Sequence, residues 1–567
     1  MHVRPDNPLI VQGDGKVLLE TKHKKYEEVR DFLSRFAEIE TSPEHLHTYR
    51  IHPLSLWNAA SSGLKRDEIV DGLRGYSKFD VPPDVLAKIA ETSDRYGLVK
   101  LVTHPSDASL LRLEFATAFI AKVIGGLKSV RELLLPDGNR YFSVSGGHRG
   151  IFKQRMLNEG WPVEDLAGFL PGDPLPFELR ETMLGNGKPF IIRDYQKASA
   201  DRWFQEGRPS GGHGVIVLPC GAGKTIVAIA AMQKVQQHTL ILATNGAAVH
   251  QWVREILDKT TLTKDDVGAY TGDTKEIRPV TVATYQILTW RASREQEFAH
   301  LHLFRDRNWG MLVYDEVHLL PAPVFGATAD VQARRRLGLT ATLVREDGRE
   351  GDVFSLVGPR RYDMAWQTLE ERGFIAEARC FEVRVDFQTK AARERYEGTA
   401  EAEKNRLASG NPEKLIALAT LLKKHQNDNV LVIGTYLDQL KIIASQHRAP
   451  LITGETPAKE REVLFQKFRE GRIKLLIVSK VANFSIDLPD ANVAIQVSGS
   501  YGSRQEEAQR LGRVLRPKKD GAWFYSIVTR DTKEQEFAMK RQLFLTEQGY
   551  RYYIQEAGQP AGCSAGK

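Results

Sequence analysis

The stretch that decides the fold is Val215-Ile216-Val217-Leu218-Pro219-Cys220-Gly221-Ala222-Gly223-Lys224-Thr225, in a chain of 567 residues. An apolar run, a glycine-rich loop and a second apolar segment follow one another, which predicts a strand, a phosphate-binding loop and a helix. The backbone N–H groups of Gly221, Ala222 and Gly223 are expected to converge on phosphates, helped by the partial positive charge of the helix N-terminus. We expect Lys224 to reach the β and γ phosphates and the Thr225 hydroxyl to hold Mg²⁺. The strict G-x4-G-K-[ST] template differs only in having glycine where this chain has Leu218.

Two adjacent acids, Asp315 and Glu316, follow the apolar run at residues 311–314 and precede Val317 and His318. Acids at the end of a buried strand are costly unless a cation or a catalytic duty retains them. We therefore expect Asp315 to hold Mg²⁺, directly or from the second layer of ligands, and Glu316 to orient or deprotonate the attacking water. His318 either relays the state of the γ phosphate to a neighbouring domain or is a hydrogen-bonded structural histidine. The acids extend the prediction from nucleotide binding to hydrolysis.

A helix is predicted at residues 505–516, where Gln509, Arg513 and Arg516 are spaced i, i+4 and i+7 and share one face. Two permanently charged guanidinium groups on one face are suited to grip a γ phosphate from across a cleft. The alternative is a solvated basic helix, which Gly512 disfavours because glycine costs about 1 kcal/mol in a helix without a packing reason.

Strand and helix patterns alternate from residue 190 to about 370 and again from about 374, as parallel sheets require. The predicted strands are Val215–Leu218, Thr239–Ala243, Val280–Thr284, Met311–Tyr314 and Leu337–Thr340 in the first series, and Val430–Gly434, Lys474–Ser479 and Val493–Val497 in the second. Two tandem α/β domains are expected. The charged segment at residues 388–414 is either a solvated helix or a DNA-facing insertion.

The N-terminal part of the chain follows a different pattern. Apolar side chains at helical spacing indicate helices at residues 26–39, 53–73 and 82–96. Strand-like residues then begin a small α+β unit that is expected to reach about residue 170, with a glycine-rich break at residues 143–150. A loop rich in proline and glycine at residues 171–176 predicts a domain boundary.

Composition narrows the class of protein. With 42% hydrophobic and 27% charged residues, the chain is expected to be soluble and folded nearly throughout. No apolar run approaches the ~20 residues of a membrane helix, and the N-terminus lacks the apolar region of a signal peptide. Three cysteines, Cys220, Cys380 and Cys563, form no metal-binding spacing and favour a reducing compartment. The net charge of +7 and the pI of about 9.0 permit a polyanionic partner.

Seven motifs occur in order along residues 190–545: IRDYQ (192–196), GAGKT (221–225), ATNGAAVHQW (243–252), DEVH (315–318), GLTATLVRED (338–347), SKVANFSIDLP (479–489) and QRLGRVLR (509–516). Together they resemble superfamily 2 DNA helicases of the XPB/Rad25 family. The first four motifs are common to most of the superfamily, whereas the Arg-Glu-Asp run at 345–347 and the last two motifs favour this family. The compact length resembles its bacterial form.

The resemblance implies a role for each matching residue. Arg193 and Gln196 would recognise adenine, and Asp487 would approach the ribose or the magnesium network. Thr340 and Thr342 would couple hydrolysis to strand movement, and Arg345, Glu346 and Asp347 would act in DNA unwinding. Arg513 and Arg516 would be arginine fingers beside Gln509. Residues 388–414 fall where the family carries a thumb-like insertion. Residues 99–175 fall where archaeal relatives carry a damage-recognition domain.

Strand contacts are also implied by the resemblance. Asn245, Gln251, Thr284 and Ser479 fall in motifs that line the DNA-binding face in this superfamily, where contacts follow the backbone of the strand. Trp252 is either a base-stacking platform or a core residue, and its place on an amphipathic helix favours the core.

We therefore expect an α/β fold with two tandem RecA-like parallel-sheet domains and a thumb-like helical insertion, preceded by an α+β N-terminal region. The predicted domains are a mainly helical one at 1–98, a small α+β one at 99–178, RecA-like domains at 179–370 and 371–556, and a flexible tail at 557–567. The resemblance implies an ATP-dependent 3'-5' DNA helicase that couples hydrolysis to strand unwinding in nucleotide excision repair. The alternatives are a duplex DNA translocase without processive unwinding and, disfavoured by the intact Lys224, Asp315, Glu316 and Arg513, a non-catalytic DNA-binding scaffold.

The expected cofactors are ATP and Mg²⁺, the latter held by Thr225 and Asp315. The expected partner is DNA at a junction of single strand and duplex, with a nuclease or repair protein as a further partner. We expect a monomer in the cytoplasm of a prokaryote, associated with the nucleoid.

Overall fold

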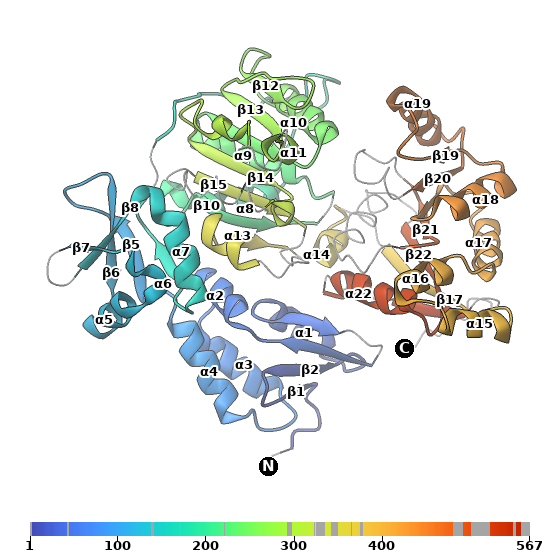
Figure 1. Ribbon diagram of the computed structural model, residues 1–567, viewed down its shortest axis with the longest axis horizontal. Helices are drawn as coiled ribbons and strands as arrows, with labels where there is room; N and C mark the ends of the chain where they lie inside the picture. The colour runs from blue at the N-terminus through green and yellow to red at the C-terminus, as the bar shows by residue number, and fades with distance from the viewer. Residues whose placement is uncertain are drawn as a thin grey trace. The chain divides into compact units, whose positions relative to one another are not determined.

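The computed structural model describes most of the chain in two compact units. The described residues are 3–41, 45–137, 141–168, 171–219, 221–291, 298–321, 324, 335–341, 350–364, 366–374, 378–479, 491–499, 522–547 and 552–556. The first unit comprises Met1–Leu218 with Gly223–Asp363, and the second Pro219–Ala222 with Met364–Lys567. Figure 1 shows the helices and strands of both units.

A seven-stranded sheet with the order β12-β13-β11-β14-β15-β10-β16 forms the centre of the first unit (Figure 1). Its strands are β10 (His213–Val217), β11 (Thr239–Ala243), β12 (Val267–Tyr270), β13 (Val280–Thr284), β14 (Met311–Asp315), β15 (Arg335–Thr340) and β16 (Arg360–Asp363). Its helices are α8 (Asp194–Phe204), α9 (Lys224–Val235), α10 (Gly246–Lys259), α11 (Tyr285–Leu288) and α13 (Glu350–Leu356), with short 3-10 turns η2 (Gln205–Gly207), η3 (Leu301–Phe304) and η4 (Val317–Leu319). Every residue of β10, β11 and β13 is buried, which is typical of a parallel sheet covered on both faces.

Parallel pairing brings the functional motifs to one edge of this sheet. All its strand pairs are parallel, so the carboxyl ends of the strands lie together. The phosphate-binding loop follows β10, Asp315 ends β14 and Thr340 ends β15. The predicted strands of this domain are confirmed to within two residues, because their apolar runs are buried throughout.

Residues 3–94 form four helices and an antiparallel sheet of order β1-β2-β4-β3. The elements are β1 (Leu9–Val11), β2 (Lys16–Glu20), α1 (Tyr26–Ser34), β3 (Glu38–Thr41), β4 (Leu46–Arg50), α2 (Pro53–Ser61), α3 (Arg66–Tyr76) and α4 (Pro83–Asp94). The helices hold more of these residues than the strands do, and the sheet is an addition that the sequence did not predict. Its strands are at most five residues long and bury few side chains each, so their alternation is weak in the sequence. The helix predicted at 26–39 ends at Ser34, and Ile39 lies in β3.

The α+β unit that follows has a five-stranded sheet of order β7-β8-β6-β5-β9. Its elements are β5 (Val99–Thr103), β6 (Leu110–Phe115), α5 (Ala118–Gly126), α6 (Lys128–Arg131), β7 (Leu135–Asp137), β8 (Tyr141–Ser145), η1 (Gly146–His148), α7 (Arg149–Asn158) and β9 (Val163–Asp165). The glycine-rich break is the turn from β8 through η1 into α7. Arg149 and Lys153 hold buried Asp165 at 2.5 and 2.9 Å, and although burial opposes them they keep the pKa of Asp165 well below its usual range.

Both N-terminal parts pack against α13 and β16 of the RecA-like domain. Buried Trp57, Leu157 and Phe354 form one apolar cluster that joins α2, α7 and α13. The Arg360 N–H donates to Asn58 Oδ1 at 3.1 Å, and the Ser62 hydroxyl donates to the Arg360 carbonyl at 2.9 Å. Strand β16 is the last element of the first unit, so the chain leaves this unit from a strand that α2 contacts directly.

A second seven-stranded parallel sheet, ordered β19-β20-β18-β21-β22-β17-β23, forms the second unit (Figure 1). Its strands are β17 (Ala378–Val385), β18 (Val430–Gly434), β19 (Leu451–Ile452), β20 (Leu475–Ser479), β21 (Val493–Gln496), β22 (Ala522–Thr529) and β23 (Tyr552–Glu556). Its helices are α14 (Trp366–Glu371), α15 (Lys390–Glu397), α16 (Glu401–Ser409), α17 (Glu413–Lys424), α18 (Leu437–His447), α19 (Ala458–Arg469) and α22 (Lys533–Glu547). The predicted fold class, with two parallel-sheet domains after an N-terminal α+β region, is confirmed. Helices α15 and α16 lie within residues 388–414, where the thumb-like insertion is predicted.

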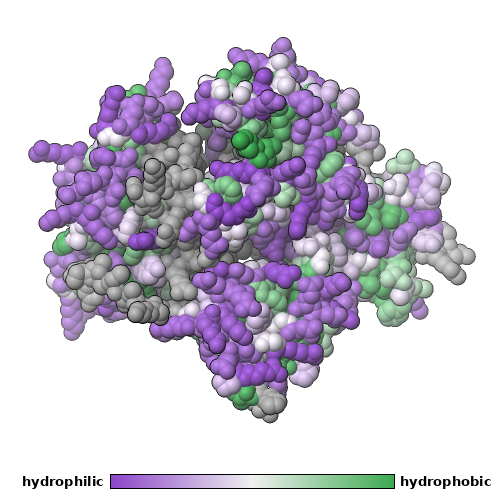
Figure 2. Space-filling view, turned by 180° about the vertical axis from the view of Figure 1, so that it is seen from behind, coloured by the Kyte–Doolittle hydropathy of each residue, from purple (hydrophilic) through white to green (hydrophobic). Residues whose placement is uncertain are grey.

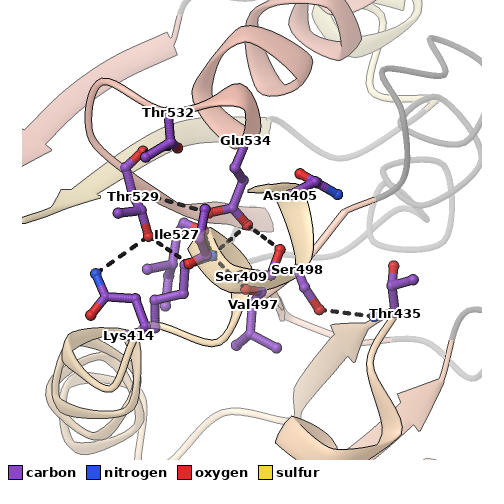
Figure 3. Close-up of polar contacts among 12 residues, drawn as sticks. Asn405, Ser409, Lys414, Thr435, Val497, Ser498, Ile527, Thr529, Thr532 and Glu534 are labelled. Atoms are coloured by element: carbon purple, nitrogen blue, oxygen red, sulfur yellow. Dashed lines mark hydrogen bonds and ion pairs between the residues drawn. The ribbon is translucent and has the colours of Figure 1, made fainter. Parts of the chain in front are cut away.

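A buried ion pair attaches the end of the insertion to the second sheet (Figure 3). Lys414 Nζ lies 2.5 Å from Glu534 Oε1, and the two side chains are 0% and 1% exposed. Lys414 also donates to the carbonyls of Val497 and Ile527, at 2.9 and 3.0 Å. Glu534 accepts hydrogen bonds from the Ser409 hydroxyl at the end of α16 and from the Thr529 N–H. The pair therefore ties α16 and α17 to β21, β22 and α22.

Hydrophilic residues predominate on the face of the molecule drawn in Figure 2, with hydrophobic ones in small patches. Among the residues that the structure describes, none of the helices is long and apolar enough to cross a membrane.

We predict that Glu534→Gln destabilises the second unit by about 3–5 kcal/mol, because it leaves the Lys414 charge buried and uncompensated. Replacing both partners in Lys414→Met/Glu534→Gln should restore part of this loss. Hydrogen exchange of peptides covering α16 and β22 in the full chain measures the effect. Glu536→Gln, on the same helical turn but with an exposed side chain, is the control. If these peptides exchange as slowly in Glu534→Gln as in Glu536→Gln, the assigned role of the pair is contradicted.

Candidate active site

The phosphate-binding loop adopts a conformation that glycine allows. Gly221 and Gly223 have φ angles of +82° and +80°, and Gly223 precedes the first residue of α9, Lys224. A Cβ atom on Gly223 would lie 2.5 Å from Gln196 Nε2, so Gln196 rests against the loop. The Arg193 N–H donates to Gln196 Oε1 at 3.0 Å, which fixes this side chain at the start of α8. The structure thus brings Gln196 of the predicted adenine-binding pair to the phosphate-binding loop, whereas the Arg193 guanidinium donates to the Tyr195 hydroxyl.

Lys224 and Glu316 form an ion pair across the edge of the sheet. Their Nζ and Oε1 atoms are 2.8 Å apart, and the side chains are 12% and 14% exposed. Glu316 has a φ angle of +49°, in the left-handed region that non-glycine residues rarely adopt. Such backbone strain is concentrated at functional sites. The turn after β14 therefore holds Glu316 in a position opposite Lys224.

Asp315 is oriented by two aromatic side chains. Its Oδ2 accepts a hydrogen bond from Trp252 Nε1 at 2.9 Å, and its backbone carbonyl accepts one from the Tyr285 hydroxyl at 2.9 Å. Burial and then the negative charge of Glu316 raise the pKa of Asp315 to about 6. Burial also opposes ionisation of Glu316, but the charges of Lys224 and His318 and the hydrogen bonds from Lys224 and Ala341 together outweigh it and lower the pKa of Glu316. The two acids therefore differ in proton affinity, as different roles require.

His318 connects β14 with β15. Its side chain is 2% exposed, and Nδ1 lies 3.5 Å from Glu316 Oε2 and 2.7 Å from Thr340 Oγ1. The Ala341 N–H, just beyond the end of β15, donates to the Glu316 carboxyl group and helps to lower its pKa. A change at Glu316 can thus reach β15 through direct contacts. His318 is therefore hydrogen-bonded, as the structural interpretation expects, and it also lies between Glu316 and Thr340, where the relay interpretation requires it.

The predicted strand-binding residues occupy different environments. Asn245 and Thr284 are the N-caps of α10 and α11, where their side-chain oxygens accept hydrogen bonds from the N–H groups of Ala248 and Ile287. Gln251 is exposed on α10. Ser479 ends β20 of the second unit and is 2% exposed.

Several predicted residues lie outside the described part of the chain. They are Cys220, Thr342, Arg345, Glu346, Asp347, Asp487, Gln509, Arg513 and Arg516. Thr225 is described and is the second residue of α9.

Two residues of the site were not assigned to it from the sequence. Trp252 is 2% exposed, as its predicted core position requires, but its indole N–H also contacts Asp315. Tyr285 is 4% exposed and donates to the same residue. Periodicity places both side chains inward, whereas their partner depends on how α10 and α11 pack on the sheet.

Known protein families match each part of the chain. The model described as ERCC3/RAD25/XPB C-terminal helicase matches residues 369–561. The helicase conserved C-terminal domain matches residues 9–133, and the type III restriction enzyme, res subunit, matches residues 189–345.

Relatives match over nearly the whole length. The chain is 49% identical to the DNA 3'-5' helicase XPB of Mycobacterium tuberculosis, over 97% of this chain and 98% of that protein. It is 50% identical to the protein of the same name from Kineococcus radiotolerans, over 97% of each chain. It is 34% identical to the general transcription and DNA repair factor IIH helicase/translocase subunit XPB of Antonospora locustae, over 96% of this chain and 81% of that protein.

These matches span the N-terminal parts as well as both parallel-sheet domains, and the residues gathered around Lys224 and Glu316 suit nucleotide hydrolysis. The chain belongs to the XPB/Rad25 family of superfamily 2 DNA helicases, in its bacterial form.

Proposed function

We propose that this protein is an ATP-dependent 3'-5' DNA helicase that uses Lys224, Asp315 and Glu316 to hydrolyse ATP. The observation that carries the proposal is the 2.8 Å ion pair between Lys224 and Glu316 beside Asp315, at the edge where the phosphate-binding loop begins α9. A partly buried lysine next to two acids can exchange a carboxylate partner for a phosphate. The bacterial relatives are named DNA 3'-5' helicase XPB, and these names support DNA as the substrate and a 3'-5' polarity.

The site fits Mg²⁺. This ion prefers oxygen ligands, and Thr225 and Asp315 offer a hydroxyl and a carboxyl group near the loop. Asp315 has a pKa raised to about 6 by burial and by Glu316, so a cation beside it would favour its ionised form. When bound, Mg²⁺ would neutralise charge on the phosphates.

Lys224 and Glu316 act in sequence in this proposal. Binding of phosphate draws Lys224 away from Glu316, and the released carboxylate orients the attacking water or takes its proton. While Lys224 is paired with it, Glu316 has a lowered pKa and is held as the carboxylate that the departure of Lys224 then releases. His318 passes the change to Thr340 in β15 through their 2.7 Å contact. Hydrolysis is thereby linked to a strand of the sheet.

The finer proposals concern the setting. We infer a role in DNA repair by nucleotide excision, supported by the repair factor named for the Antonospora relative. A nuclease or repair protein would be the partner, and residues 99–178 would act as a damage-recognition-like domain. Arg513 and Arg516 would supply positive charge to the γ phosphate.

Displacement of a strand from duplexes with a 3' or a 5' overhang tests the proposed 3'-5' helicase activity. Unwinding of only the duplex with the 5' overhang would contradict it.

Translocation on duplex DNA is the second candidate. The Antonospora relative is named a helicase/translocase subunit, which favours this candidate. A translocase displaces the third strand of a triplex on blunt duplex DNA without separating a forked duplex. Measuring both reactions with one preparation distinguishes it from a helicase.

We predict that Lys224→Ala and Glu316→Gln each lower DNA-stimulated ATP hydrolysis by about 10²-fold or more, because they remove the phosphate ligand and the group that activates water. Lys234→Ala is the matched control, since Lys234 lies on the same helix and pairs with Asp201. Steady-state turnover at saturating DNA gives the comparison. Normal turnover in either site variant would exclude the assigned roles.

We predict that Trp252→Phe weakens the affinity of the site for Mg²⁺, because it keeps the packing but removes the hydrogen-bond donor to Asp315. Loss of a hydrogen bond that orients a metal ligand lowers metal affinity or activity by about 10–100-fold. The Mg²⁺ concentration that gives half-maximal ATP hydrolysis should rise accordingly. Trp309→Phe serves as control, since Trp309 is buried and donates instead to the Leu303 carbonyl. An equal effect of both substitutions would mean that only packing matters.

We predict that Thr340→Val uncouples ATP hydrolysis from DNA unwinding, because it removes the hydroxyl that His318 contacts. ATP hydrolysis should continue, while the number of base pairs separated per ATP falls. Thr281→Val, in buried β13, is the control. Unchanged unwinding per ATP in Thr340→Val would argue against the relay.

A further inference from the structure

An exposed tryptophan lies beyond the carboxyl end of β13. Trp290 follows the short helix α11 and is 52% exposed. Its backbone N–H donates to the Ile287 carbonyl at 3.2 Å, which fixes the turn that carries the ring. Strand β13 ends at the same edge of the sheet as β10 and β14, where Lys224 and Asp315 lie. The ring therefore extends from a loop on the catalytic edge.

A column of aromatic rings supports this tryptophan. Tyr270 is 4% exposed, and its hydroxyl lies 2.9 Å from His300 Nδ1. The His300 ring lies edge-on to Tyr270 with centroids 5.7 Å apart, and its centroid is 5.9 Å from that of Trp290. Burial and the positive charge of Lys275 lower the pKa of His300, which favours a neutral ring. Trp290 thus rests against the partly buried His300, which buried Tyr270 supports in turn, so less conformational freedom is lost when Trp290 binds a partner.

The surroundings of Trp290 suit nucleic acid better than protein. Arg291 is the next residue and is exposed, with its guanidinium carbon 5.1 Å from the centroid of Phe298. Among the described residues from 267 to 310, Trp290 is the only large hydrophobic side chain that is exposed. A protein-binding patch would have an apolar core of several side chains. An isolated aromatic ring beside a cation is the arrangement that stacks on a base and contacts its phosphate.

We propose that Trp290 stacks on an unpaired base of single-stranded DNA while Arg291 contacts the adjoining phosphate. The inference rests on the proposed function, because that function supplies the DNA strand, and it adds a contact for the strand on the first RecA-like domain. Stacking on a flat ring depends little on base identity, as a motor that moves along any sequence requires.

The test compares two oligonucleotides of equal length, one of thymidines and one wholly abasic, whose binding to the full chain is followed by fluorescence anisotropy. Trp290→Ala should weaken binding of the thymidine strand by about 5- to 100-fold and leave the abasic strand unchanged, because only the first offers bases to stack. Trp290→Phe should retain most of the affinity. Arg291→Ala should weaken both strands and reduce the salt dependence of binding by about one ion.

Tyr553→Ala is the matched control, since Tyr553 is an aromatic residue that is 55% exposed on β23 of the second unit. The inference is overturned if Trp290→Ala binds thymidine strands like the wild type, as a protein-docking residue would, or if it loses equal affinity for both strands. Wild-type ATP hydrolysis that ignores DNA would instead refute the proposed function. The two failures are therefore distinguishable.

Discussion

The ion pair between Lys224 and Glu316 is the interaction on which the rest of the site depends. It places a cation and an acid 2.8 Å apart at the edge of a parallel sheet, with the partly buried Asp315 next to Glu316 in the chain. Removing such charges from water costs free energy unless the charges compensate one another or bind a ligand. The left-handed turn at Glu316 and the positive φ angle of Gly223 are local consequences, since each brings one partner to the edge. The parallel order of β10, β14 and β15 makes the meeting possible.

The remaining parts of the fold surround this site with rigid supports. Trp252 and Tyr285 connect Asp315 to α10 and α11, and His318 connects Glu316 to β15. In the second unit, buried Lys414 and Glu534 fix the base of the helical insertion. The N-terminal parts contact α13 and β16, the elements from which the chain continues into the second unit. In both units, buried charges are paired where secondary-structure elements from distant parts of the sequence meet.

Much of this arrangement was predictable because its signals are local. Buried strands such as 239–243 and 430–434 are unbroken apolar runs, and the acids at 315 and 316 directly follow one. The N-terminal sheet was missed since strands of three to five residues carry little periodicity. The contacts of Trp252 with Asp315 and of Lys414 with Glu534 were also missed, because each joins residues more than 60 positions apart. Asn245 and Thr284 were predicted from motifs to bind DNA, and their capping bonds show a structural duty that motifs do not reveal.

The central claim is that the charged cluster at Lys224 drives movement along DNA. The most direct measurement is steady-state ATP hydrolysis by the purified wild-type chain with Mg²⁺, in the presence and absence of single-stranded DNA. We expect slow turnover without DNA and a clear acceleration when DNA is added, because we propose that the strand and the nucleotide bind at the same edge of the sheet. Turnover that is absent under both conditions, or equal in both, would contradict it.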